Sequence, residues 1–138
     1  MSVRKGERTE GNLQVLNISL ELAKYTLRIC SNEKVFPKKQ RWIMTQKMVN
    51  ECLEVLCCVR RANSVFVKTA EDFSYRRAQQ VLARAHLSAF TTLADLSYNA
   101  FSIESHRVEH WSKLIAETDD KLTAWMKSDL TRYEKSLK

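Results

Sequence analysis

Apolar residues recur every three or four positions along nearly the whole chain, a spacing that predicts amphipathic helices rather than strands. The first helix follows a polar N-terminal segment, and Asn12 is a suitable N-cap for it. Pro37 comes after this helix, where it suits the first turn of the next one. The predicted helices cover residues 12–31, 38–67, 73–100 and, from an N-cap at Ser102 or Ser105, to about residue 128.

Each predicted helix carries an apolar seam that would pack into a common core. The second helix offers Trp42, Thr45, Val49, Cys52, Leu56, Val59, Asn63 and Phe66. The third offers Ala78, Val81, Leu82, Ala85, Ala89, Leu93, Leu96 and Ala100. The fourth offers Val108, Trp111, Ile115, Thr118, Leu122 and Trp125.

The scarcity of turn-forming residues sets the fold class. The chain has 138 residues but only two glycines and one proline, whereas a β-sandwich or barrel needs such residues about every ten positions. Long helices with short connections predict an all-α protein, an antiparallel up-down-up-down four-helix bundle. We expect residues 1–11 to be flexible, residues 12–130 to form the bundle and residues 131–138 to form a C-terminal tail.

The first predicted helix is apolar on two sides. One seam contains Leu13, Leu16, Leu20, Ala23, Leu27 and Cys30, and the other contains Val15, Ile18, Leu22, Tyr25 and Ile29. The middle of the second helix, ECLEVLCCV, is also apolar over a broad arc. A bundle core covers one seam of each helix, so a second one would be an exposed apolar patch. We therefore expect these two helices to contact another copy in a homo-oligomer.

The sequence carries no motif for catalysis or metal binding. Four-helix bundles with two-metal centres use Glu-x-x-His pairs, and none occurs here. His106 and His110 have a metal-ligand spacing but lie at the charged start of a helix, and His86 is expected to be a hydrogen-bonded residue at the core boundary. We expect neither enzyme activity nor a metal or other cofactor.

The cysteines fit a reducing compartment. Cys30, Cys52, Cys57 and Cys58 all lie in predicted helices, where free thiols act as small core residues. Cys57 and Cys58 point to different helix faces and make a poor metal clip. No apolar run approaches the roughly 18 residues of a membrane span, and no signal-type apolar segment follows the charged N-terminus. We expect a cytoplasmic protein without membrane contact.

Positive charge is concentrated in part of the chain. The formal net charge is +7, and the segment from Lys34 to Asn50 has five basic residues and no acidic one. Residues 104–138 carry equal numbers of both signs. Segregated charge of this kind indicates a polyanionic partner, either a nucleic acid or an acidic protein surface.

Two basic clusters are candidate binding sites. If successive helices alternate in direction, one cluster combines Arg60, Arg61, Lys68, Arg76, Arg77 and Arg84, here named the arginine patch. Arg76, Gln80 and Arg84 are spaced by four and are expected to share a stripe off the Ala/Leu face. The other cluster, here named the basic turn, contains Lys34, Lys38, Lys39, Arg41 and Lys47. We expect the arginine patch to be the main site, because arginine binds phosphate in a fork and the basic turn begins in a loop expected to be mobile.

Four segments together resemble a known family: KVFPKKQRW, VRRAN, LADLSYNAFSI and above all HWSKLIAETDDKLTAWMKSD. They are similar to the accessory variability determinant proteins of diversity-generating retroelements, small bundles related to proteins encoded in intervening sequences of bacterial large-subunit rRNA genes. The resemblance covers about residues 12–129. The resemblance rests on the order and spacing of core and cap residues. The family has no functional motif that can be matched residue by residue in this sequence.

The resemblance implies a homopentamer with a basic surface and no catalysis of its own. Such a protein binds the element's reverse transcriptase, interacts with its template RNA or RNA/cDNA, and supports mutagenic cDNA synthesis. A second class of function stays open: a structural protein–protein adaptor whose positive charge meets an acidic protein surface, with no direct nucleic-acid binding.

Overall fold

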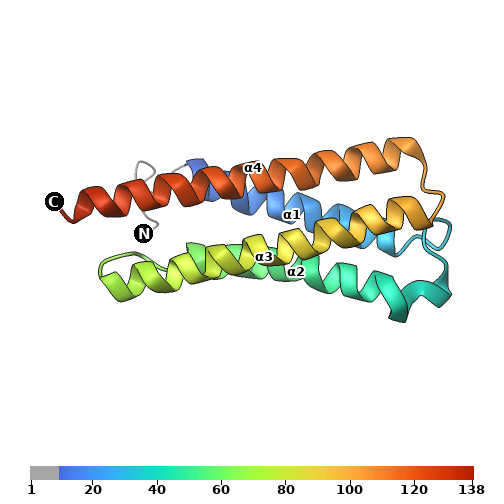
Figure 1. The fold of residues 1–138 in the computed structure, drawn as a ribbon, viewed down its shortest axis with the longest axis horizontal. Helices are drawn as coiled ribbons and strands as arrows, with labels where there is room; N and C mark the ends of the chain where they lie inside the picture. The colour runs from blue at the N-terminus through green and yellow to red at the C-terminus, as the bar shows by residue number, and fades with distance from the viewer. Residues whose placement is uncertain (1–9) are drawn as a thin grey trace.

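The computed structural model describes residues 10–138, which form four α-helices and no strand. The helices are α1 (Glu10–Cys30), α2 (Gln46–Asn63), α3 (Ala70–Ala100) and α4 (Ser105–Ser136). A 3-10 turn (Lys38–Gln40) and a π turn (Arg41–Thr45) lead into α2. Figure 1 shows successive helices crossing the length of the molecule in alternate directions. The predicted all-α four-helix bundle is confirmed.

Each helix packs against the next one in sequence, and α4 packs against α1, so the four helices form a closed square. α1 lies against α2 and α4, and α3 lies against the same two helices, so α1 and α3 occupy opposite corners (Figure 1). Within residues 10–138, no helix is both long and apolar enough to cross a membrane.

Helix boundaries differ from the predicted ones where capping intervenes. α3 begins at Ala70 because Thr69 and Asp72 form a capping box, in which each side chain accepts a hydrogen bond from the other's backbone N–H at 3.1 Å. α4 has Glu104 at its N-cap, rather than either predicted serine, and no side-chain cap bond there. It continues to Ser136, so most of the predicted C-terminal tail is helical. Of the segment predicted to be flexible, residues 1–9 lie outside the described part, and residues 10 and 11 are helical.

The core is organised around Trp111 of α4. Its indole N–H donates to the hydroxyl of Thr26 on α1 at 3.0 Å, so a buried polar group is satisfied. The ring also lies in edge contact with the rings of Tyr25, Phe36 and Tyr98. The predicted seam of the fourth helix is confirmed, except that Val108 is half-buried.

The face that α3 turns inward is not the predicted one. Its buried residues are Arg76, Gln80, Ala83, Leu87, Phe90, Ala94 and Ser97. Most of the predicted Ala/Leu seam faces solvent instead, with Val81, Leu82 and Leu96 50%, 45% and 54% exposed. Leu93 is the member of that seam that is half-buried against the core. The helix has two faces of helical spacing, and the prediction preferred the one without polar residues.

An ion pair explains why polar residues of α3 can point inward. Arg76 Nη1 donates to Asp129 Oδ1 of α4 at 2.8 Å, and its other nitrogens donate to the backbone oxygens of Ala62 and Val65 at 3.1 and 2.7 Å. Gln80 Nε2 donates to the second carboxylate oxygen of Asp129 at 3.2 Å. The guanidinium and the carboxylate are thus paired and hydrogen-bonded, which a buried charge requires.

On α1 and α2 the predicted seams are only partly buried. The core of α1 is the second seam, with Val15, Leu22 and Ile29 at most 1% exposed, while Leu13, Leu20 and Leu27 of the first are 42–46% exposed. This finding fits the expected excess apolar face of α1.

In the second predicted helix, Trp42 and Phe66 are 75% and 55% exposed. They lie outside α2, in the π turn and in the connection to α3, where the helical phase of the seam does not hold.

We expect Asp129→Asn to lower the free energy of unfolding by about 3 kcal/mol, because it leaves a buried guanidinium without its counter-charge. Urea unfolding followed by circular dichroism measures the change. Asp119→Asn, at an exposed position of the same helix, is the control and should stay within about 0.5 kcal/mol of wild type. Equal stabilities of the two variants would contradict a structural role for the pair.

Candidate nucleic-acid interface

The arginine patch is not one continuous surface. Arg76 is 8% exposed and fully engaged inside the bundle, which corrects the expectation that it shares a solvent-facing stripe with Gln80 and Arg84. Gln80 is buried with it. Only Arg84 of the three is exposed.

The remaining arginines of the patch lie on two sides of α3. On the α2 side, Arg61 of α2 donates through its Nε to Gln79 of α3 at 2.9 Å, and its Nη2 is 3.7 Å from Glu54 of its own helix. On the α4 side, Arg77 donates to the backbone oxygen of Met126 at 2.7 Å, and Arg84 donates to Thr123 at 3.3 Å. The carboxylate of Glu54 therefore lies beside the patch. The outward face of α3 separates Arg61 from Arg77 and Arg84.

Arg60 and Lys68 lie nearer the end of the bundle where α3 begins. Arg60 lines a hollow of about 600 Å³ whose wall also includes Arg76, Asp129 and Arg132. Lys68 is exposed, with its ammonium 5.7 Å from the centre of the Phe66 ring. The hollow mixes both signs of charge with apolar side chains, so its charge does not single out a polyanion.

The basic turn lies at the opposite end of the bundle (Figure 1). All five of its basic side chains belong to exposed residues. Among the ion pairs of residues 10–138, one involves this group: Lys38 Nζ is 3.9 Å from Glu33. Its positive charge is thus more available than that of the arginine patch.

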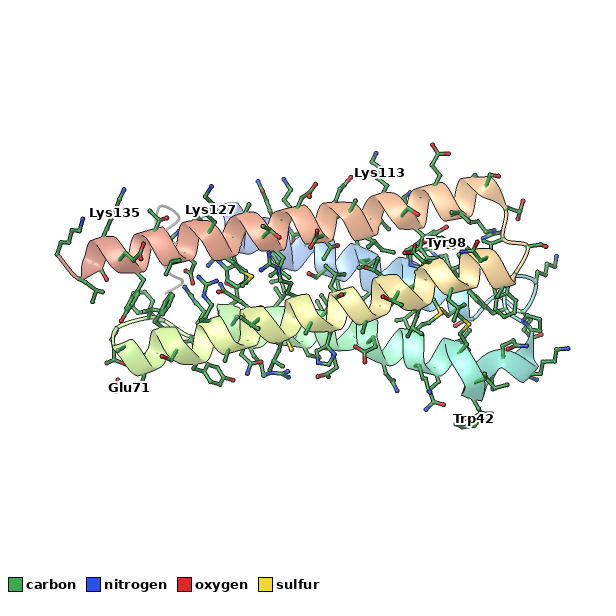
Figure 2. All side chains as sticks on the ribbon, in the orientation of Figure 1. Trp42, Glu71, Tyr98, Lys113, Lys127 and Lys135 are labelled. Atoms are coloured by element: carbon green, nitrogen blue, oxygen red, sulfur yellow. The ribbon has the colours of Figure 1, made fainter. Side chains whose placement is uncertain are left out.

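Trp42 stands within the basic turn. It is 75% exposed, and its neighbour Ile43 is 69% exposed. Figure 2 shows the indole pointing away from the bundle. Met44 and Thr45, the next residues of the π turn, are buried instead. Single π turns occur often at functional sites, and an exposed aromatic ring offers a face on which nucleic-acid bases can stack.

Trp42 also lines a hollow of about 400 Å³. Lys38 and Arg41 form part of the same wall, together with Leu27 and Pro37. Glu33, the partner of Lys38, is the one carboxylate in this wall. An aromatic ring beside cations and apolar side chains is the combination with which proteins bind single-stranded nucleic acids, because bases stack while phosphates meet the charges.

The backbone of the basic turn is held by the core, contrary to the expectation of a mobile loop. Phe36 is 2% exposed and lies edge-on to Phe101 and Trp111, with ring centres 5.3 and 6.3 Å apart. The backbone N–H groups of Val35 and Phe36 both donate to Asn32 at 2.9 Å. Ordering this surface on binding therefore costs less entropy than a loose loop would.

The histidines lie largely as expected. His106 and His110 are exposed at the start of α4. His86 is half-buried, and its Nδ1 lies 2.7 Å from Glu51 Oε2 on α2, which confirms its hydrogen-bonded place at the core boundary. The sequence did not predict that Glu54, Cys58 and His86 meet between α2 and α3.

Comparison with family models and with curated proteins finds no relative of this chain. The likeness to the accessory variability determinant family rests on the four segments quoted above.

We expect one cysteine to react rapidly with a thiol reagent at pH 8. Burial raises the pKa of Cys30 to about 12 and that of Cys52 to about 11, so both stay protonated, and Cys58 is buried. Cys57 is exposed. Titration of the native protein with a chromogenic disulfide should show a fast phase that Cys57→Ser abolishes. Persistence of that phase in the variant would contradict the placement.

Proposed function

We propose that this protein is a non-catalytic, self-associating accessory subunit that binds RNA through the basic turn and acts with a reverse transcriptase in the cytoplasm. The observation that carries the proposal is Trp42, a solvent-exposed tryptophan surrounded by basic side chains that are almost free of carboxylate partners. Stacking on aromatic rings and neutralisation of phosphates are the two terms that dominate single-strand binding.

The reverse transcriptase enters the proposal from the resemblance to the accessory variability determinant family. KVFPKKQRW, one of the segments that carries this resemblance, contains four of the five basic residues of the turn together with Trp42. A reverse-transcriptase gene and an imperfect repeat pair beside the gene for this protein would support the assignment to a diversity-generating retroelement.

Self-association is supported by two outward apolar seams. The α1 seam consists of Leu13, Leu20 and Leu27, and the α3 seam consists of Tyr75, Ala78, Val81, Leu82, Ala85, Ala89 and Leu96. Both follow heptad spacing, as helices that pack against another helix do. The small residues of the α3 seam allow a close approach.

The positions of the seams favour a ring. Because α1 and α3 occupy opposite corners of the bundle, the α1 seam of one copy can pack on the α3 seam of the next. Such a head-to-tail contact closes into a ring when the rotation between copies permits it. The resemblance implies that the ring has five members.

Removing charge from the basic turn should weaken RNA binding. We expect Lys39→Ala with Arg41→Ala to reduce the affinity for mixed-sequence single-stranded RNA about tenfold, which corresponds to about 1.4 kcal/mol. The slope of log affinity against log salt should flatten by roughly one to one and a half units, for two lost phosphate contacts. Fluorescence anisotropy at several salt concentrations measures both.

The matched control is Arg77→Ala with Arg84→Ala, which removes the same charge from the arginine patch. It is expected to bind RNA within about twofold of wild type. The reverse result, with the control failing and the basic-turn variant binding normally, would move the site to the arginine patch. If the wild-type protein binds no RNA at low salt, the protein is a protein–protein adaptor instead.

Charged substitutions in either seam should break the assembly. Light scattering is expected to give a multimer for wild type and a monomer for both Leu20→Glu on α1 and Leu82→Glu on α3. A mixture of the two variants should form a dimer, because each retains the seam that the other lacks. Leu130→Glu, at an exposed site on α4, is the control and should leave the mass unchanged. A monomeric wild-type protein at micromolar concentration would overturn self-association.

A further inference from the structure

Three side chains with metal-binding atoms meet between α2 and α3. Glu54 and Cys58 lie one turn apart on α2 and face the same way, and His86 comes from α3. A carboxylate oxygen, the thiol sulfur and an imidazole nitrogen all lie within 4.8 Å of one another. A tetrahedral zinc ion holds such atoms roughly 3.5 Å apart, so side-chain movements of about 1 Å would close the site.

His86 has a carboxylate partner of the kind that metal-binding histidines have. Its Nδ1 lies 2.7 Å from Glu51 Oε2. When Nδ1–H donates to this carboxylate, Nε2 keeps a lone pair for a metal ion. Metal-bound histidines almost always have such a partner behind them, because it fixes the tautomer and makes the ligand more basic. The contact between His86 and Glu51 therefore supports a metal site independently of how close the three ligand atoms lie.

We propose that Glu54, Cys58 and His86 form a binding site for a divalent transition-metal ion, zinc above all. A thiolate, an imidazole and a carboxylate together suit zinc, whereas magnesium and calcium prefer oxygen ligands alone. The Glu54 side chain is 47% exposed, so the fourth position faces solvent and takes a water molecule. The site lies away from the basic turn and goes beyond the proposed RNA binding.

The charges of the ligands themselves suit a divalent ion. On binding, Cys58 releases its proton to solvent, and the thiolate and Glu54 then balance the two positive charges. The positive charge of Arg61 opposes a metal ion: its Nη2 donates to Cys58 Sγ at 3.2 Å and lies 3.7 Å from Glu54, so it has to leave both ligands when a metal binds. Its hydrogen bond to Gln79, 2.9 Å long, remains available to hold the guanidinium.

Cobalt(II) tests the site, because it occupies zinc sites and its bond to a thiolate gives a charge-transfer absorption. Metal-stripped, reduced full-length protein is expected to develop this band to saturation at one cobalt ion per chain and to lose it when zinc is added. Cys58→Ser should abolish the band. Cys57→Ser, which changes the exposed neighbouring thiol, should leave it unchanged.

Two further variants separate a metal site from a hydrogen-bonded cluster. Each is expected to bind cobalt at least tenfold more weakly: His86→Gln by loss of a ligand, and Glu51→Gln by loss of the orienting carboxylate. Circular dichroism shows whether the variants are folded. The proposal is overturned if wild type shows no band, if the band survives Cys58→Ser, if Cys57→Ser abolishes it, or if folded His86→Gln binds cobalt like wild type.

Discussion

The buried ion pair between Arg76 and Asp129 sets how α3 is rotated in the bundle. A guanidinium removed from water needs a carboxylate and further acceptors around it, and the end of the bundle where α3 begins provides both. Once Arg76 is held inside, the helical repeat of 3.6 residues turns Phe90 and Ala94 inward and Leu82 outward. The inward face of α3 is thus specified by its polar end as much as by its apolar middle.

This rotation also shapes the outer surface. It withdraws Arg76 from the arginine patch and leaves Arg61 and Arg77 on different sides of α3. Between them it exposes a heptad stripe of small and branched apolar residues, which no helix within residues 10–138 covers. The basic turn is unaffected, because Phe36 attaches it to the aromatic cluster around Trp111 at the other end. The apolar face for assembly and the basic face for a polyanion therefore adjoin at Leu27, which belongs to the α1 seam and also lines the hollow beside Trp42.

The sequence predicted the all-α bundle and the core seam of α4 correctly, because length, spacing and the lack of turn residues act locally. The prediction of the inward face of α3 was wrong, because the charged residue Arg76 was assumed to face water. Its partner Asp129 lies 53 positions further along the chain, so no local pattern indicates the pair. Trp42 was assigned to the core because regular helical spacing does not anticipate a π turn. The Glu54–Cys58–His86 cluster was missed because its members join only when α2 and α3 pack; the Glu-x-x-x-Cys spacing on α2 was the one local signal.

The proposed metal site and the proposed RNA site act on different parts of the molecule. His86 follows Leu82 by one helical turn and precedes Ala89 by three residues, so the cluster borders the α3 seam. A metal ion there would clamp α2 to α3, and it would reinforce the rotation that Arg76 imposes from the end of the helix. Its effect should fall on stability and assembly, because Phe36 anchors the basic turn to Trp111 of α4 and to Phe101 at the end of α3, and not to this cluster. RNA affinity per chain would then be independent of the metal, and any metal dependence of RNA binding would have to arise from the number of chains brought together.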